Sequence, residues 1–263
     1  MPNEIPKRWR GLAPAASPFI VIIIFCVAPT ASARILTLRP PPSSTWNPLL
    51  PFTIGMGVEY ETDREQTQVD FPMFVEYNIS RTLKVNIEPN VTHIAAKVKD
   101  VRTVTGFADL ETSFEYEFLR ERRYRPAFTV LGGIKWPTST DPDIGNPGRD
   151  YIVGLIASKD FGYVDADLAV TYTASGDPTT QDPLEITLAG DWHLNHFFDI
   201  EGEVVRTIGA SRKLGASGVD LTEGTLGGAW HITKRLKVEL GGTLRSDRTW
   251  QIVTACEFSF TGD

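Results

Sequence analysis

Apolar and polar residues alternate strictly near the C-terminal end of the chain, in the stretch 249–260. A period of two predicts a β-strand with one apolar face and one mixed face. The stretch is close to the roughly 9–11 residues that a tilted strand needs to cross a bilayer. The apolar parity comprises Trp250, Ile252, Thr254, Cys256, Phe258 and Phe260.

The same alternation recurs along the chain from Phe52 onward. We predict twelve strands, an even number, as a closed antiparallel membrane barrel requires; closure satisfies every backbone polar group in lipid. Pro72 and Pro89 each remove a ladder donor and are the weak points of this assignment. The predicted strands are 52–60, 71–79, 83–91, 108–118, 128–136, 151–159, 164–173, 184–194, 198–206, 222–232, 236–245 and 249–260.

The connections between these predicted strands alternate in length, except at 246–248. Short turns on one rim and long loops on the other are typical of an outer-membrane barrel, with the short turns periplasmic and the longer loops extracellular. We therefore predict an all-β, transmembrane antiparallel barrel, with the loops 137–150 and 207–221 as constriction or gating elements. The predicted short turns are 80–82, 119–125, 160–162, 195–196 and 233–235, and the predicted long loops are 62–70, 93–107, 137–150, 174–183 and 207–221.

Aromatic residues on the apolar parity gather at the predicted strand ends rather than along the strands. Such clustering predicts the two girdles that flank the lipid-facing band of a membrane barrel. The predicted girdle residues are Tyr60, Tyr77, Phe118, Trp136, Tyr151, Tyr172, Trp192, Trp230, Trp250 and Phe260.

The segment that precedes the predicted barrel divides into two parts. Residues 1–33 have a basic start, an apolar core from Phe19 to Val27 and a small-residue site at residues 31–33, which together predict a cleaved secretory signal. Residues 34–51 are rich in proline and predict an extended periplasmic tail. The barrel then spans 52–263. Removing the signal leaves Cys256 as the single cysteine, so no internal disulfide is possible, and its parity places it toward lipid.

Acidic residues dominate the polar parity. The predicted signal holds three of the 26 basic and one of the 33 acidic residues, so the remaining chain has nine more acidic than basic side chains. This balance argues against a nucleic-acid partner. If the polar face lines a lumen, its carboxylates favour cations; the equally weighted alternative is that they pair and simply fill a narrow barrel. The predicted lumen residues are Glu59, Glu88, Asp109, Glu111, Glu115, Glu117, Asp165, Asp167, Asp191, Glu201, Glu203, Lys84, Lys135 and Arg245.

Several stretches resemble a known family. GFADLETSFEYEFL (106–119), RPAFTVLGGIKWPTS (125–139), DYIVGLIASKDFG (150–162) and VDADLAVTYT (164–173) resemble the outer-membrane transporters associated with the "meta-pathway of phenol degradation". The resemblance covers about 70 residues and its motifs are degenerate. It implies passage of small, often aromatic or apolar compounds across the outer membrane. The C-terminal strand likewise resembles the closing strand that barrel assembly machinery recognises, although Phe260 is not the last residue.

Enzyme chemistry finds little support. None of the four histidines is followed by serine two residues later, as the twelve-stranded outer-membrane phospholipase requires. His193 and His231 lie on polar faces near one rim and could meet a metal, but hydrogen-bonded lumen histidines are the commoner case. We predict a passive channel in the outer membrane that needs no cofactor and no metal. The rival is a closed structural or adhesive barrel. The expected partners are the lipid bilayer, a small solute and the assembly machinery.

Overall fold

The computed structural model describes residues 52–63, 65–98, 102–177, 182–212, 216–247 and 249–260. The predicted signal peptide and proline-rich tail lie outside these ranges. Fourteen strands form one antiparallel sheet, and they follow the predicted alternation closely. The strands are β1 (Phe52–Thr62), β2 (Gln66–Asn78), β3 (Leu83–Glu88), β4 (Asn90–Ala96), β5 (Val104–Phe107), β6 (Leu110–Leu119), β7 (Ala127–Trp136), β8 (Asp150–Asp160), β9 (Val164–Ala174), β10 (Leu184–Asn195), β11 (Phe198–Arg212), β12 (Ala216–His231), β13 (Leu236–Arg245) and β14 (Trp250–Phe260).

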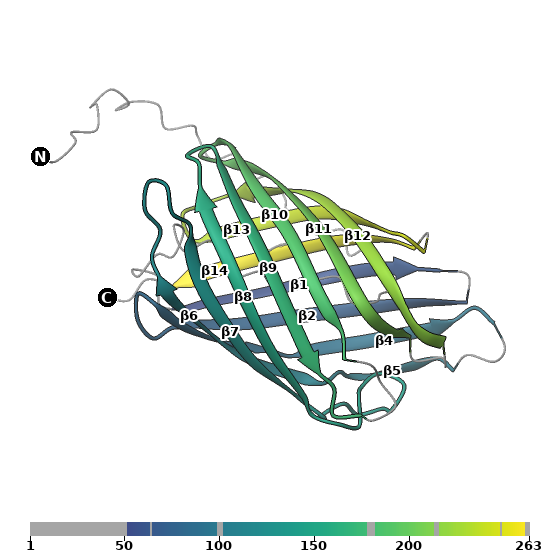
Figure 1. Cartoon of the computed structure of the whole chain (residues 1–263). Helices are drawn as coiled ribbons and strands as arrows, with labels where there is room; N and C mark the ends of the chain where they lie inside the picture. Colours follow the sequence, from purple (N-terminus) through teal and green to yellow (C-terminus); the bar gives the residue numbers. More distant parts are fainter. Residues whose placement is uncertain are drawn as a thin grey trace, which may run out of the picture.

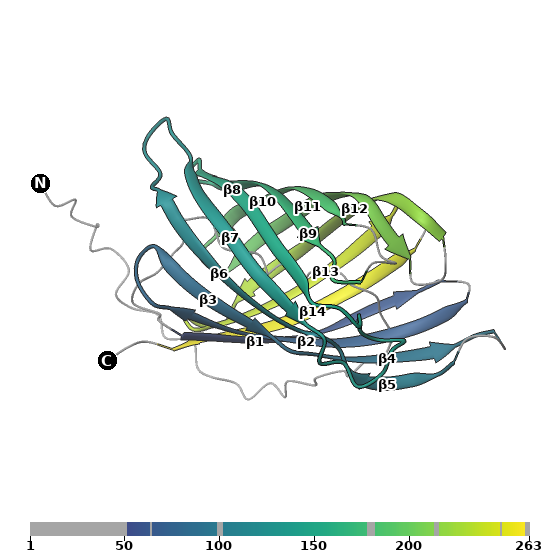
Figure 2. The ribbon, with the colours of Figure 1, turned by 60° about the horizontal axis from the view of Figure 1, so that its bottom comes forward.

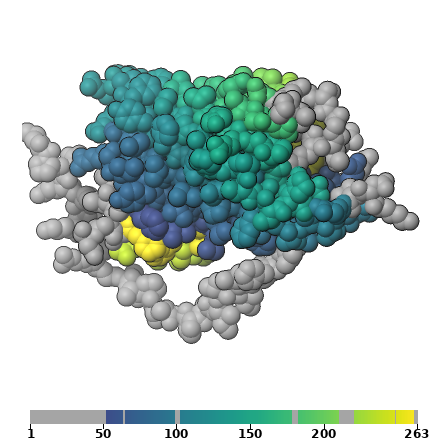
Figure 3. Space-filling view, turned by 90° about the horizontal axis from the view of Figure 1, so that it is seen from below, coloured from purple at the N-terminus to yellow at the C-terminus, as the bar shows by residue number. Residues whose placement is uncertain are grey.

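The sheet closes on itself because β14 pairs with β1. The two strands are in register over their whole length, from Phe52 opposite Phe260 to Thr62 opposite Trp250. The other strands pair with their neighbours along the chain, except at the breaks between β3 and β4 and between β5 and β6, and this gives the barrel of Figure 1. In the space-filling view the atoms of β1 and β14, purple and yellow, lie against each other (Figure 3). The predicted closed antiparallel barrel is confirmed.

Two positions in the wall are each occupied by two strands, so the fourteen strands make a twelve-stranded barrel. Pro89 interrupts the first position: β3 pairs with β2 and β6, whereas β4 pairs with β2 and β5. The Pro89 carbonyl still accepts the Met73 amide at 2.9 Å. Ala108 and Asp109 interrupt the second position, between β5 and β6. A proline without an amide hydrogen explains the first break.

The two ends of the barrel differ, and we name them by their connections. The turn rim carries both strand ends that lead to the termini and five turns, at 79–82, 120–126, 161–163, 196–197 and 232–235. The loop rim carries six connections, at 63–65, 97–103, 137–149, 175–183, 213–215 and 246–249.

Three of the five predicted long loops differ from the structure. Residues 66–70 belong to β2, residues 93–96 and 104–107 belong to β4 and β5, and most of 207–221 belongs to β11 and β12. These strand ends continue because backbone pairing past the apolar band does not need an apolar face; Gln66, for example, pairs with Ala96. The rule based on connection length therefore predicted longer loops than the loop rim has. Only three of its connections are long.

The two faces of the wall have opposite character. Apolar side chains on the outward parity are exposed, among them Leu226 at 67% and Leu240 at 61%. The inward parity is polar and buried, as with Glu59 and Gln251, each 2% exposed. This is the reverse of a water-soluble barrel and is the pattern of a wall that faces lipid. The described residues contain no helix long and apolar enough to cross a membrane.

Candidate functional site

The interior of the barrel holds the charged residues that the sequence pattern placed on its polar parity. All fourteen predicted lumen residues lie on the inward parity. Nine of them are buried: Glu59, Lys84, Asp109, Glu115, Glu117, Asp165, Asp167, Glu201 and Glu203. The other five are half-buried: Glu88, Glu111, Lys135, Asp191 and Arg245.

A buried lysine organises the first group of carboxylates. The Nζ atom of Lys84 on β3 lies 3.1 Å from Glu76 Oε2 on β2 and 3.3 Å from Glu115 Oε2 on β6. Lys84 is 1% exposed and Glu115 is 2% exposed, so the three charges compensate one another away from bulk water. Asn86 Nδ2 donates a further bond to Glu115 at 3.3 Å. One cation thus ties three strands of the wall together from inside.

Two more cations repeat this arrangement across the closing strands. Lys237 lies 2.7 Å from Glu239, 3.6 Å from Glu257 and 3.8 Å from Glu201. Toward the loop rim, Arg245 lies 2.5 Å from Glu61 and 2.8 Å from Glu223. Glu61 is on β1 and Arg245 on β13, so this cluster spans the closure. Each cluster holds more carboxylates than cations, which leaves the interior acidic.

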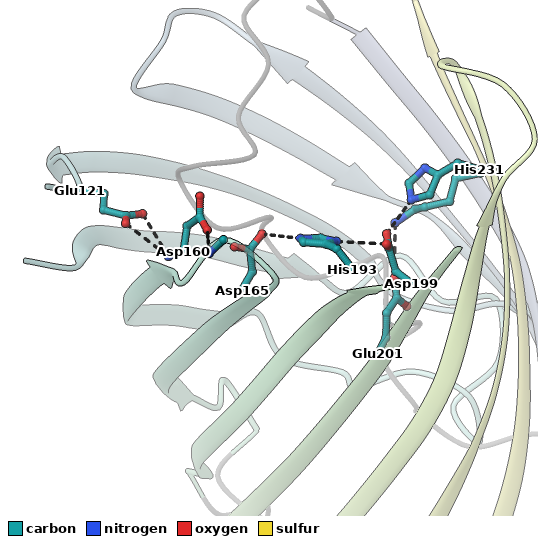
Figure 4. Close-up of polar contacts among 9 residues, drawn as sticks. Glu121, Asp160, Asp165, His193, Asp199, Glu201 and His231 are labelled. Atoms are coloured by element: carbon teal, nitrogen blue, oxygen red, sulfur yellow. Dashed lines mark hydrogen bonds and ion pairs between the residues drawn. The ribbon is translucent and has the colours of Figure 1, made fainter. Parts of the chain in front are cut away.

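A chain of hydrogen bonds runs across four strands near the turn rim (Figure 4). His193 on β10 bonds Asp165 on β9 at 3.2 Å through Nε2 and Asp199 on β11 at 3.1 Å through Nδ1. His231 on β12 bonds the second oxygen of Asp199 at 2.7 Å. Both imidazoles are therefore held by carboxylates, and the described residues include no group of three or more His, Cys, Asp or Glu arranged for a metal ion.

Asp199, which bonds both histidines, was not among the predicted lumen residues. It shares the inward parity of His193 and pairs directly with it. The pairing depends on a register shift between His193 and Asn195, beside the turn 196–197. Parity therefore predicts that the two side chains share a face, but not that they lie opposite each other.

The loop 137–149 is tied to the interior by Asp109. The buried Asp109 carboxylate accepts the backbone amides of Ser139, at 3.0 Å, and of Asn146, at 2.6 Å. Thr140 meanwhile exchanges bonds with Phe107: its amide donates to the Phe107 carbonyl at 3.0 Å, and its hydroxyl accepts the Phe107 amide at 2.9 Å. The start of this loop thus continues the sheet along the edge of β5, which pairs with β4 alone.

This loop packs against the inner side of β5. A Cβ atom added at Gly106 would lie 2.2 Å from the Thr140 hydroxyl and 3.1 Å from Ile144. The neighbouring Thr105 and Phe107 are exposed on the other face, so Gly106 faces inward. The loop 137–149 therefore lies against the inner side of the wall at the loop rim, and its predicted narrowing of the opening stays a prediction.

A second carboxylate joins this loop to the loop 175–183. Asp150 Oδ1 accepts Asn146 Nδ2 at 2.9 Å, the Ser175 hydroxyl at 3.2 Å and the Gly176 amide at 3.0 Å. The two backbones touch at Gly148 and Gly176, since a Cβ atom at Gly148 would lie 2.2 Å from the Gly176 carbonyl carbon. We call the residues Asp109, Asn146, Gly148, Asp150 and Gly176 the loop latch.

An arginine from the loop 97–103 adds an outer contact. Arg102 bonds Asp141, and its Nε lies 3.0 Å from Asp143 Oδ2. The hydrogen bond to Asp141 raises the pKa of Arg102 above its ordinary value. Arg102 is more than half exposed, so this pair adds little to stability.

The predicted aromatic girdles divide between the two rims. Tyr60 and Trp250 stack at 4.9 Å near the loop rim. Trp136 donates its indole N–H to Thr112 at 2.9 Å, and Tyr172 donates its hydroxyl to Asp182 at 2.9 Å. The remaining girdle residues are all exposed on the outward face: Tyr77, Phe118, Tyr151, Trp192, Trp230 and Phe260. Cys256 is also exposed on this face.

The second predicted gating element, 207–221, is not a loop. β11 and β12 continue as a paired hairpin past Thr207 opposite Leu221, with register shifts before Ala210 and before Arg212. In the described part of this segment, most residues therefore belong to the wall rather than to a loop. The constriction role of the loop 137–149 stays a prediction.

Comparison with known proteins gives a fold but no family. No protein-family model and no curated protein sequence matches the chain. Among solved structures, an outer membrane channel from Pseudomonas putida F1 superposes with a TM-score of 0.69 at 10% identity, over 84% of this chain and 100% of that one. The fold is that of an outer-membrane channel barrel. The KdgM porin in complex with disordered oligogalacturonate is also similar, with a TM-score of 0.55 at 10% identity over 78% of this chain and 99% of that one. The NanC porin superposes with a TM-score of 0.56 at 11% identity, over 79% of this chain and 100% of that one.

Proposed function

We propose that this protein is a passive channel of the bacterial outer membrane that carries small solutes through an acidic interior. The turn rim would face the periplasm and the loop rim the outside, as short turns and long loops do in barrels of this kind. The phenol-degradation transporter family remains the proposed relationship, on the strength of the stretches between Gly106 and Thr173.

One observation carries the proposal: the closed wall is apolar and exposed outside, and polar and buried inside. A barrel with this polarity has a lipid-facing surface and an interior able to hold water and polar groups. The three cation clusters and the histidine chain are accounted for as ion pairs and hydrogen bonds within the wall, without a catalytic constellation. A non-enzymatic role is part of the proposal.

The chemistry of the inner wall suggests which solutes to test. The excess of carboxylates disfavours anions. Apolar side chains interrupt the charges on the inward parity, including Phe74, Ile94, Ile156 and Val253. A path with both kinds of lining suits small cations and small neutral molecules with an apolar or aromatic part. In this account the loop latch holds the entrance at a fixed width, and the acidic wall selects by charge.

A second function is favoured by the close filling of the interior. Glu59, Lys84 and Gln251 are each 1–2% exposed, so little water reaches the middle of the wall from inside. A closed, side-chain-filled barrel would act as a structural or adhesive surface protein. The channel is expected to conduct ions, whereas the closed barrel is expected not to conduct.

Single-channel recording on the refolded barrel in a planar bilayer tests the proposal. We expect discrete steps with cation preference, and a loss of that preference in the triple variant Glu111→Gln, Glu115→Gln, Glu117→Gln. The matched control removes three exposed acids from the loop rim and from β12, with Glu65→Gln, Asp143→Asn and Asp220→Asn, and should keep the preference. Unchanged ion preference in the interior variant would rule out the acidic filter. A folded barrel that stays silent would favour the closed structural role.

A further inference from the structure

The five turns of the turn rim carry a charge opposite to that of the whole chain. They contain seven basic residues, Arg81, Arg120, Arg122, Arg123, Arg125, Lys234 and Arg235, and one acidic residue, Glu121. The six connections of the loop rim contain seven basic and eight acidic residues. The full chain has 26 basic and 33 acidic residues. Basic charge is therefore concentrated on one end of the barrel.

The same turns expose large aromatic side chains. Tyr124, Phe161, Tyr163 and Phe197 are between 54% and 85% exposed. Tyr124 and Phe197 each follow a girdle residue within a few positions of the chain, Phe118 and Trp192 respectively, and Phe161 and Tyr163 lie in the turn between β8 and β9. Aromatic rings exposed beside cations are costly in bulk water and favourable in the headgroup layer of a membrane.

The turn 120–126 presents these groups furthest from the wall. It forms a small hairpin in which Arg122 and Arg125 bond each other's backbone at 2.9 and 3.1 Å. Figure 2 shows this hairpin, between β6 and β7, projecting from the rim where the chain begins and ends. At its tip the Arg123 guanidinium lies 5.1 Å from the centroid of the Tyr124 ring.

In the part of the chain that the structure describes, three cations of the turn rim have no carboxylate partner. Within the described chain, Arg122, Arg123 and Lys234 have no carboxylate within ion-pair distance, whereas Arg120 lies 3.5 Å from Glu117. The only acid in the turns, Glu121, is bonded by Lys159. On the loop side, Arg102 pairs with Asp141 and Asp143, and Arg206 pairs with Asp220 at 2.7 Å. The turns thus hold more positive charge than their own acid compensates.

We propose that the turn rim binds the phosphate headgroups of anionic phospholipids in the leaflet that it contacts. The inference rests on the proposed membrane orientation. The turns begin directly beyond the girdle and are two to seven residues long, so they can present their cations to the phosphate layer of the membrane. Each Lys or Arg at that depth attracts an anionic surface, and the attraction weakens with salt.

Electron spin resonance of spin-labelled lipids around the reconstituted barrel measures this preference. In phosphatidylcholine bilayers we expect labelled phosphatidylglycerol to be enriched about two- to threefold over labelled phosphatidylcholine at the protein surface, and high salt to reduce the enrichment. The variant Arg122→Gln, Arg123→Gln, Lys234→Gln should bring the ratio close to one. The control Lys97→Gln, Arg102→Gln, Arg206→Gln removes the same charge toward the loop rim and should keep it.

Three results would overturn the proposal. One is a native barrel without enrichment, and another is an equal loss in both variants. The third is a barrel without lipid preference that binds heparin, used as a soluble polyanion, which would assign the rim to an anionic partner in solution. Conductance of the same preparation is independent: a silent barrel that keeps its lipid preference contradicts the channel and not the lipid site.

Discussion

The two rims of this barrel use their charged residues in different ways. At the loop rim, long connections must be held in place, and carboxylates such as Asp109 and Asp150 do so by accepting backbone amides. At the turn rim such support also occurs, since the Glu121 carboxylate accepts the Asp160 amide at 3.3 Å, but the turns hold seven basic residues against one acid. The loop rim thus uses charge mainly to hold its connections, whereas the turn rim also has an excess of positive charge for contact with its surroundings.

The largest expected effect comes from the interior clusters that lie below each rim. Replacing Lys84 by Met removes the only cation between Glu76 and Glu115, and a buried ion pair that loses one partner costs about 3–5 kcal/mol. Arg245→Met, toward the loop rim, should cost less because Arg245 is more exposed, at 11% against 1%. Urea unfolding of the two variants in one lipid system measures both. Equal losses of unfolding free energy in the two variants would mean that the ion pairs near the two rims contribute equally to stability.

A smaller and local effect is expected from Asp109→Ala. The substitution removes the acceptor of two amides, and hydrogen bonds to a charged group are worth about 1.5–3 kcal/mol each. Hydrogen exchange should accelerate in 137–149 and stay unchanged in the turns of the opposite rim. Asp109→Asn, which keeps one acceptor oxygen, should lie between. Protection of 137–149 that survives the alanine would show that the edge of β5 holds the loop without the latch.

The smallest expected effects come from substitutions at two glycines, Gly148 and Gly162, which differ in their surroundings. Gly148→Ala at the loop rim forces the backbones at Gly148 and Gly176 apart and should cost about 1–3 kcal/mol. Gly162 at the turn rim has φ +91° and open space around its Cβ position. Gly162→Ala should therefore cost about 1–2 kcal/mol through backbone strain alone. Gly162→Asn should recover part of this loss, because asparagine tolerates positive φ, whereas Gly148→Asn should be worse than alanine. Thermal unfolding in detergent tests the order.

The alternation along the chain was enough to predict the wall. Twelve strand positions, their faces and the closure follow from it, because a strand that faces lipid on one side must alternate. The prediction was wrong at 66–70 and 207–221, because the strands continue there beyond the end of the alternating pattern. There the ladder bonds continue into a region with no lipid to impose an apolar face.

The sequence pattern placed the interior charges but could not assign their partners. Parity put Lys84 and Glu115 on the inner face, yet their contact depends on β3 pairing with β6 across the break that contains β4 and β5. The contacts of the loop latch were harder still to predict from the sequence, because they depend on the path of the loop 137–149. Gly106, Asp109 and Asp150 nevertheless belong to the stretches that resemble the transporter family. Their role in the structure gives that resemblance a physical meaning.

The pairing of β1 with β14 has a consequence for biogenesis. Phe52 meets Phe260, and Thr53 bonds Ser259 at 3.1 Å, so the first strand of the barrel waits for the last to be synthesised. Until then the growing sheet has two unpaired edges with an apolar face, which is the form most prone to aggregate. Closure between β1 and β14 is therefore the pairing that removes both open edges at once, and the wall is protected from pairing with other chains only when it is complete.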